Sequence, residues 1–485
     1  MTGDRADTTD LGKAIAGILP ALESFYRFEG EDLAARRRNE WRAALDRSLP
    51  ERGEGLDPVT KLLRDIVIPN GLRNGAPGFA GWITTSPTTS AVTASLAATV
   101  AGSQRWWVQS FNFLETVALR WLRELLELPE ELQGTFCGGG SSANIIALGA
   151  ARQHAFERLG IDPSRDGLPA RPWRVYASTE VHHVVTRAAA ILGLGRRSVR
   201  MIKTDDALRI DVGALRAALE EDARAGIHPV AIVATAGTVN TGAIDPIAPL
   251  LEIARERGIW LHVDGAYGAF GVLDARVAPL FQGMTEADSI AVDPHKWLAA
   301  PLGTGAVFAR DRARLGRAFT LEPAEYLEGA AAAGEPRSPF DDFGDAYHDF
   351  NLDQSAPSRG AAVWAVLLEI GAEGMRERVT RHLDFARRVA ELARADERLE
   401  VLSEPVLSIC CFRYRAPGQD EAALNGLNAR IAQRLRAETR YVPSTTVVQG
   451  RFAIRPCFIN PRTTMAEVEG MVSSVRRIGD ALARE

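Results

Sequence analysis

The pattern of apolar and polar positions changes twice along the chain, and each change marks a predicted boundary. The first part mixes apolar and polar residues with the period of a helix, most clearly over residues 31–49. A strongly amphipathic helical pattern over residues 114–129 ends at Pro129. The helical period in the first part predicts a helical N-terminal segment over residues 1–90, and the helix over residues 114–129 follows it.

From residue 135 onward, short runs rich in strand-forming residues alternate with helical stretches. One helical stretch covers residues 211–226, with Asp211 as its predicted N-cap and Gly226 as its end. Such alternation predicts a mostly parallel sheet with helices on both faces, and we assign residues 91–371 to this large α/β domain. The predicted strands are residues 173–178, 229–235, 259–264, 288–293 and 305–310.

The pattern changes again near residue 372. Helical stretches near residues 372–396, 420–437 and 464–483 are separated by short apolar runs such as residues 406–414. This arrangement is typical of a small α+β domain built on an antiparallel sheet. We assign residues 372–485 to it.

Composition and charge exclude several function classes. The chain has 485 residues, of which 46% are hydrophobic and 25% charged, with a net charge of −5, as in an ordinary globular protein. It has no long basic run with interleaved aromatic residues, so we expect no nucleic-acid partner. No stretch approaches the ~18 apolar residues of a membrane span, and the N-terminus shows no apolar signal region. We therefore expect a cytoplasmic protein with no membrane partner.

Neither the cysteines nor the histidines indicate a metal or a disulfide framework. Four cysteines are too few for such a framework in a chain of this length. Cys410 and Cys411 are adjacent in an apolar run, and Cys137 adjoins a glycine run, so we interpret all three as packing residues. His182 and His183 are adjacent and cannot face the same way on one helical turn, so the sequence predicts no metal site.

Candidate chemistry lies directly after the predicted strands. In an open parallel sheet, ligands bind beyond the carboxyl ends of the strands. The run Gly138–Asn144 opens a helical stretch, where glycines allow close approach, Ser141 or Ser142 could cap the helix, and the helix start favours an anion such as phosphate. A tight turn with a serine cap is an equally simple explanation of that run.

Two charged groups follow later strands. Asp264 ends an apolar strand and is followed by Gly265 and Ala266, which leave room for a flat group. Lys296 lies in the run Asp293–Trp297 between apolar stretches; burial there favours its neutral, nucleophilic amine. Alone, this lysine could equally be a surface residue on a loop. Together, an anion site, a carboxylate and an amine at one sheet edge match the phosphate, pyridine nitrogen and aldehyde of pyridoxal phosphate.

At these residues the chain resembles the pyridoxal-phosphate-dependent amino-acid decarboxylases of the aromatic-L-amino-acid and glutamate decarboxylase group. The resemblance extends from about Pro77 to the C-terminal helix and implies fold type I. It also implies a homodimer with active sites at the subunit interface, formed with help from the N-terminal segment. The motifs that carry it are HVDGAYGAF (262–270) and DPHKWL (293–298), supported by residues 138–144, 178–189, 233–247 and 455–464.

The resemblance also implies roles for single residues. Lys296 would form the Schiff base with the cofactor aldehyde, Asp264 would pair with the pyridinium nitrogen, and Ala266 would lie against the ring. His182 would stack on the other face of the ring. Further contacts would come from residues around the phosphate and the substrate carboxylate: Gly140, Ser141, Asp293 and His295 at the phosphate, Thr238 at the cofactor, and Thr84 at the substrate carboxylate.

The reaction implied by the resemblance is decarboxylation to an amine. By register, Tyr347 matches a loop tyrosine that protonates Cα, and the Ala/Gly/Pro-rich residues 328–339 fit a mobile lid. Related aldehyde synthases lack either this tyrosine or the stacking histidine, and both are present here as Tyr347 and His182. The alternatives are an aldehyde synthase and a cofactor-binding protein without decarboxylase activity.

The substrate is read from aromatic residues. Trp82 and Trp107, with Trp106, Phe111 and Phe113, favour an aromatic or large apolar amino acid. A dimer-interface core explains the same residues equally well, because interfaces favour them. An acidic amino acid would need an arginine, for which Arg105 or Arg359 could serve.

Overall fold

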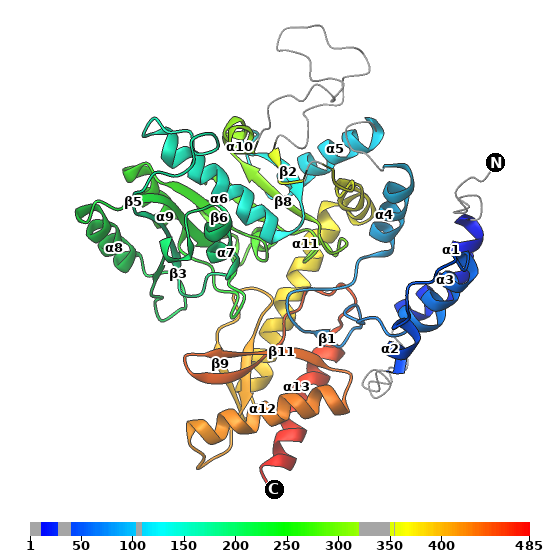
Figure 1. The fold of residues 1–485 in the computed structure, drawn as a ribbon. Coiled ribbons are helices and arrows are strands. Elements are labelled where there is room, and N and C mark those ends of the chain that lie inside the picture. Colours follow the sequence, from blue (N-terminus) through cyan, green and yellow to red (C-terminus); the bar gives the residue numbers. More distant parts are fainter. Residues whose placement is uncertain (1–10, 28–39, 103–108, 320–349, 354) are drawn as a thin grey trace, which may run out of the picture.

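The structure is a computed structural model that describes residues 11–27, 40–102, 109–319, 350–353 and 355–485 (Figure 1). Its centre is a seven-stranded sheet in which β8 runs antiparallel to both neighbours and the other pairs are parallel. The predicted mostly parallel sheet is confirmed. In spatial order the strands are β2 (Gln133–Cys137), β8 (Gly305–Ala309), β7 (Ser289–Val292), β6 (Trp260–Asp264), β5 (His228–Thr235), β3 (Trp173–Ser178) and β4 (Val199–Ile202).

Helices cover both faces of this sheet because alternate strand residues point to opposite sides. In β6, Leu261 and Val263 join one apolar cluster, whereas Trp260 joins the other. The first cluster also contains residues of α5 (Gln109–Leu125), α8 (Val212–Arg224) and α9 (Ile247–Arg257). The second contains residues of α6 (Gly140–Glu157), α7 (Val184–Ile191) and α10 (Arg312–Phe319).

The predicted N-cap of α8 is confirmed. Asp211 precedes this helix, and its Oδ1 accepts a hydrogen bond of 2.9 Å from the backbone amide of Ala214.

A second, five-stranded sheet forms the C-terminal region, as predicted for a small α+β unit. Its strands β9 to β12 pair antiparallel, and α12 (Glu421–Glu438) and α13 (Met465–Leu482) pack on it. The short β1 (Phe79–Ala80) adds to β11 in parallel, so the N-terminal part of the chain completes this sheet. The spatial order is β1, β11 (Val442–Val448), β12 (Arg451–Arg455), β10 (Cys411–Tyr414) and β9 (Leu399–Ser403).

One long helix joins the two sheets. α11 (Gly360–Arg394) runs from the large sheet to the C-terminal region, as Figure 1 shows. At Gly371 the backbone takes φ 65° and ψ −178°, which interrupts the helical path. At its start, Glu115 Oε1 accepts a hydrogen bond of 2.9 Å from the amide of Gly360. The domain boundaries at residues 90 and 371 remain predictions.

The N-terminal helices stand at the side of the molecule (Figure 1). They are α1 (Leu11–Arg27), α2 (Glu40–Leu45) and α3 (Leu56–Leu62), and neither α1 nor α3 contains a buried residue. They lead through a loop to β1 and α4 (Thr89–Ala101). Within the described residues, no helix combines the length and apolar character needed to cross a membrane.

A buried carboxylate gives the large domain a pH-dependent stability. Asp245 accepts hydrogen bonds from the backbone amides of Ile210 (2.7 Å) and Thr235 (2.8 Å). Burial raises its pKa from 3.8 to about 6. The folded protein therefore binds more protons than the unfolded chain between these values, so the free energy of unfolding falls as the pH rises through this window.

We expect the Asp245→Asn variant to lose this dependence. Between pH 3.8 and 6 the wild type should lose about 3 kcal/mol of stability that the variant does not lose. Urea unfolding at fixed protein concentration across this range measures the difference, and Asp206→Asn, an exposed residue nearby, is the control. Parallel pH profiles of wild type and Asp245→Asn would contradict the expectation.

Candidate active site

The turn after β7 that contains Lys296 is compact and mostly buried. Lys296 Nζ lies 3.1 Å from Asp293 Oδ2, and the amide of Lys296 donates to the carbonyl of Asp293 at 3.0 Å. The next residue, Trp297, is fully buried and stacks on Tyr267 with ring centroids 6.0 Å apart. The tryptophan thus anchors the turn in the core and leaves the lysine amine at the sheet edge.

The glycine run meets this turn at the start of α6. Gly139 has φ +101°, a backbone conformation that favours glycine, and it is the N-cap residue. A Cβ added to Gly140 would lie 2.6 Å from Asp293 Oδ2 and 3.1 Å from the Cβ of Ala266. The prediction that Ser141 or Ser142 caps the helix is wrong, because Gly139 holds the cap position and both serines lie within the first turn.

Asp264 and His182 lie at the same edge. Asp264, 6% exposed, ends β6, and its Oδ1 accepts from the amide of Ala266 at 3.2 Å. Burial and then the neighbouring His183 lower the pKa of His182; the charge of Lys296 acts in the same direction, and that of Asp264 opposes it. The imidazole is therefore neutral at pH 7.

The proton of His182 can be assigned from its contacts. Its Nδ1 accepts a hydrogen bond of 3.3 Å from the amide of Val184, so Nε2 carries the proton. The rings of His182 and His183 lie only 4.1 Å apart between centroids. The two rings thus lie side by side at the start of α7, contrary to the expectation that they face apart.

Two predicted cofactor contacts have partners within the chain. The hydroxyl of Thr238 is hydrogen-bonded to that of Thr241 (3.0 Å) and accepts from the amide of Ala243 (3.1 Å). His295 Nδ1 donates to the carbonyl of Thr304 at 2.9 Å, which directs Nε2 towards Asp293 Oδ2, 3.8 Å away. The role of Thr238 at the cofactor stays a prediction.

The predicted substrate residues are only partly described. Thr84 is half-buried, with Oγ1 3.5 Å from Asn74 Nδ2, and Trp82 is 61% exposed. Arg359 donates to the carbonyl of Gly303 at 3.0 Å. Phe113 is exposed on α5 and Phe111 half-buried. Four of the predicted residues lie outside the described ranges: Tyr347, Trp107, Trp106 and Arg105.

A buried histidine that sequence reasoning missed supports the glycine turn. His262 Nδ1 lies 2.9 Å from the hydroxyl of Ser289, and Nε2 lies 3.1 Å from Asn144 Oδ1. Asn144 in turn donates to the carbonyl of Gly140 at 2.9 Å. Burial lowers the pKa of His262 to about 4, so this chain of hydrogen bonds is neutral. In the sequence, this histidine could have been noticed as a polar residue within an apolar strand, two positions before Asp264.

These residues fit pyridoxal phosphate. The start of α6 with its glycine turn suits a phosphate, Asp264 suits a pyridine nitrogen, and Lys296 suits an aldehyde. Asp293 Oδ1 is buried without a hydrogen-bond partner within the described chain, as expected where a ligand completes the site. Among the described residues, no group of three or more histidine, cysteine or acidic side chains could hold a metal ion.

Comparison with known proteins decides the family. Residues 39–415 match the family described as the pyridoxal-dependent decarboxylase conserved domain. The chain belongs to this family. The decarboxylase is 30% identical over 372 residues to an aromatic-L-amino-acid decarboxylase of Bacillus atrophaeus, covering 76% of this chain and 74% of that one.

Two further relatives extend the comparison. The decarboxylase is 28% identical over 458 residues to a phenylacetaldehyde synthase of Petunia hybrida, covering 89% of this chain and 87% of that one. Its fold matches the crystal structure of Oryza sativa TDC with PLP and tryptamine, with a TM-score of 0.87, 24% identity and 99% of both chains covered. The protein is thus a fold type I carboxy-lyase that decarboxylates an amino acid with pyridoxal phosphate.

We expect Gly140→Ala to weaken cofactor binding. Its new Cβ would press on Asp293 Oδ2 and Ala266, both within 3.1 Å, and should raise the Kd for pyridoxal phosphate about tenfold or more, or about 1.4 kcal/mol. Titration of the apoenzyme, followed by cofactor absorbance, measures this. Gly426→Ala is the matched control, because nothing lies within 4 Å of its added Cβ. An unchanged Kd in Gly140→Ala would contradict the assignment of the phosphate site to the start of α6.

Proposed function

We propose that this enzyme converts an aromatic or large apolar L-amino acid to the corresponding amine and carbon dioxide. The observation that carries the proposal is the joint position of Lys296, Asp293, Gly140 and Ala266 at one sheet edge. The aromatic side of the proposal is supported by the exposed Trp82 on the loop that contains Thr84. It is also supported by the relative that acts on aromatic L-amino acids.

The cofactor would be held by side chains from several elements. Lys296 would bind its aldehyde, Asp264 would accept a hydrogen bond from its protonated ring nitrogen, and the first turn of α6 would hold its phosphate. Neutral His182 would lie on the ring without adding a positive charge beside it. When bound, pyridoxal phosphate supplies the electron sink for the bond broken at Cα.

The lysine has a proton acceptor within reach. An amine must be neutral to act as a nucleophile. Asp293 Oδ2 lies 3.1 Å from Lys296 Nζ and 3.8 Å from His295 Nε2. The carboxylate of Asp293 therefore lies where it can orient the amine towards the cofactor aldehyde.

Amine rather than aldehyde is the proposed product. Tyr347 would return a proton to Cα after carbon dioxide leaves, and His182 would keep the ring in place. Aldehyde formation is the second candidate, favoured by the 28% identity to a phenylacetaldehyde synthase.

We also propose the cytoplasm as the compartment, because all four cysteines are free, buried thiols.

A substrate panel tests the function. Protein with added pyridoxal phosphate would meet each proteinogenic amino acid plus Dopa, 5-hydroxytryptophan and cysteine sulfinate, with carbon dioxide and the organic product measured together. We expect equal yields of carbon dioxide and amine from an aromatic acid, and none from Lys296→Ala. Turnover of cysteine sulfinate or glutamate alone would contradict the proposed substrate class.

The same assay tests the product with Tyr347→Phe. If Tyr347 supplies the proton, amine formation should fall by about 100-fold or more, and aldehyde with oxygen uptake should take its place. The control is Tyr26→Phe, whose hydroxyl donates to the carbonyl of Pro87 at the N-terminal helices. A Tyr347→Phe enzyme that makes only amine at the wild-type rate would exclude this role.

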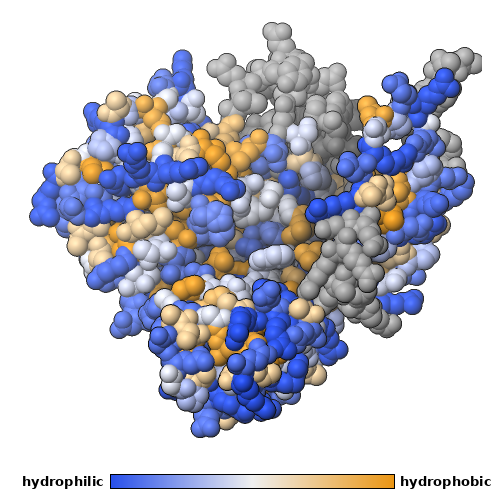
Figure 2. Space-filling model, turned by 60° about the horizontal axis from the view of Figure 1, so that its bottom comes forward, coloured by the Kyte–Doolittle hydropathy of each residue, from blue (hydrophilic) through white to orange (hydrophobic). Residues whose placement is uncertain are grey.

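We further propose that the enzyme is a homodimer. α1 and α3 bury no residue within the described chain, which is unusual for helices with apolar faces. On α4, Val92, Leu96 and Val100 recur at every fourth position and are all exposed. On the face seen in Figure 2, hydrophobic residues (orange) lie exposed among hydrophilic ones (blue). A second copy of the chain would cover these faces.

Leu96→Asp should break the dimer. A charge in the apolar stripe of α4 would be buried unpaired at the interface, so sedimentation at micromolar concentration should show a monomer. Leu159→Asp is the matched control, since Leu159 (42% exposed) and Leu96 (44% exposed) are equally accessible. A monomeric wild type, or a Leu96→Asp variant that still sediments as a dimer, would contradict the proposal.

A further inference from the structure

Trp82 has a backbone conformation that its side chain disfavours. Its φ is +50°, in the left-handed region that bulky residues rarely adopt. Both of its backbone polar groups are bound by the C-terminal sheet: the amide donates to Ser444 Oγ at 2.5 Å, and the carbonyl accepts from Arg455 Nη1 at 3.0 Å. Strained backbone of this kind persists only where its surroundings impose it, and it concentrates at functional sites.

Arg455 binds two loops of the active-site region at once. Besides Trp82, its guanidinium donates to the carbonyl of Asn240 at 3.1 Å and to that of Val239. Residues 239 and 240 belong to the loop after β5 that contains Thr238. Arg455 is only 3% exposed, so these carbonyls replace water around its charge. One buried side chain therefore fixes both loops against the C-terminal sheet.

Asn240 extends this contact towards the stacking histidine. Its Nδ2 donates to Glu180 Oε2 at 2.8 Å, and its Oδ1 accepts from the hydroxyl of Thr446 at 2.9 Å. Glu180 lies two residues before His182. The C-terminal sheet is thus linked by hydrogen bonds to the loop that carries His182 as well as to Trp82.

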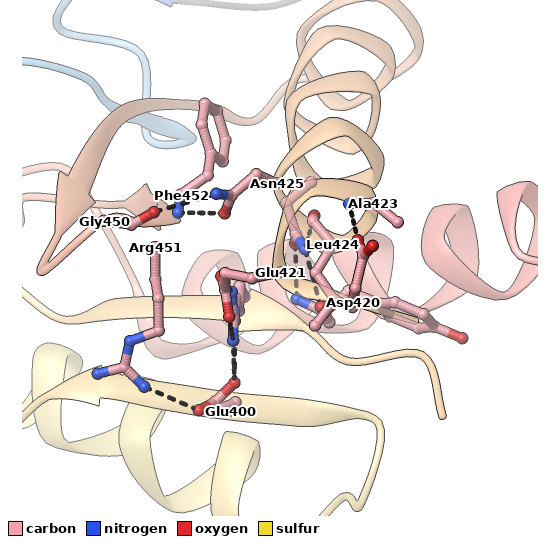
Figure 3. Close-up of polar contacts among 12 residues, drawn as sticks. Glu400, Asp420, Glu421, Ala423, Leu424, Asn425, Gly450, Arg451 and Phe452 are labelled. Atoms are coloured by element: carbon pink, nitrogen blue, oxygen red, sulfur yellow. Dashed lines mark hydrogen bonds and ion pairs between the residues drawn. The ribbon is translucent and has the colours of Figure 1, made fainter. Parts of the chain in front are cut away.

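Ser444 and Arg455 are held in place by the β11–β12 hairpin. Ser444 and Arg455 are direct partners across the β11–β12 hairpin, so their side chains lie on the same face of the sheet. Figure 3 shows how the far end of the hairpin is held: Asn425 Nδ2 donates to the carbonyl of Gly450 (3.0 Å), and the amide of Phe452 donates to Asn425 Oδ1 (2.6 Å). Arg451 also pairs with Glu400 at 3.1 Å.

We infer that Ser444 and Arg455 form a clamp that positions Trp82 and thereby sets which amino-acid side chains the enzyme accepts. Neither clamp residue touches the reacting atoms; both act as positioning residues through Trp82. The clamp fixes the backbone of Trp82 and so limits the positions open to its indole, and this would favour a flat aromatic side chain over a branched aliphatic one. The inference rests on the proposed function for the identity of the substrate, but the clamp itself can be tested without any substrate.

Hydrogen exchange tests the clamp directly. In the holoenzyme, Ser444→Ala should speed exchange of the Trp82 amide about tenfold, because its only described acceptor is lost. Ser444→Thr keeps a hydroxyl and should restore the wild-type rate. Thr445→Ala, a half-buried neighbour on the other face of the strand, should leave the rate unchanged. Equal rates in Ser444→Ala and wild type would overturn the inference.

Substrate discrimination tests the consequence. We expect Ser444→Ala and Arg455→Lys to lower the kcat/KM ratio of the best aromatic substrate to leucine about fivefold or more, mainly through KM. The Kd for pyridoxal phosphate in Ser444→Ala should stay unchanged. Faster exchange with an unchanged ratio would reduce the clamp to a structural role and overturn the specificity claim.

The two proposals fail in different ways. If the wild type decarboxylates no aromatic amino acid, the proposed function is wrong, while the exchange rates still decide whether the clamp holds Trp82. In that case the ratio is measured between the best substrate found in the panel and its nearest smaller analogue. A ratio that Ser444→Ala leaves unchanged there would overturn the clamp as a determinant of specificity.

Discussion

The active site depends on one close approach, between the first turn of α6 and the end of β7. A Cβ on Gly140 would stand 2.6 Å from Asp293 Oδ2, so only glycine allows the two segments to meet. That contact puts the free amides of a helix start beside the turn that carries Lys296. The parallel strands of the sheet end at a common edge, which brings the residues that follow them together. Gly140 then allows α6 to approach the end of β7 closely. Neither would assemble the site alone.

The same edge of the sheet contains several buried polar groups. Each needs hydrogen-bond partners, because burying an unpaired polar group is unfavourable, and this explains which residues surround them. A fully buried imidazole is unfavourable unless both nitrogens are hydrogen-bonded. Both nitrogens of His262 are hydrogen-bonded, one to Ser289 and one to Asn144. Asn144 in turn donates to the carbonyl of Gly140 and so fixes its position. A residue of the sheet core thus holds the turn on which the phosphate would rest. One continuous set of contacts thus stabilises the sheet core and would also support the cofactor.

The sequence predicts those features that depend on residues close together in the chain. Asp264 and Lys296 could be placed because the first ends a strand and the second lies in the turn after the next strand, and Asp211 because an N-cap acts on its own helix. The cap of α6 could not be placed: serines are preferred there, yet the turn needs φ +101°, which Gly139 adopts at lower cost. In the same way, the hydroxyl of Thr238 is hydrogen-bonded within its own loop, and no local pattern reveals that.

The contacts around Trp82 belong to a different class. Arg455 and Trp82 are 373 positions apart, and they meet because β1, a strand of two residues, pairs with β11. A strand that short gives no periodic signal, and the left-handed backbone of Trp82 runs against its residue preference. The C-terminal region therefore holds the loop that contains Trp82 and Thr84, while contributing none of the predicted catalytic residues. A catalytic set at strand ends can be inferred from the order of motifs, whereas contacts between segments this far apart in the sequence require the tertiary structure.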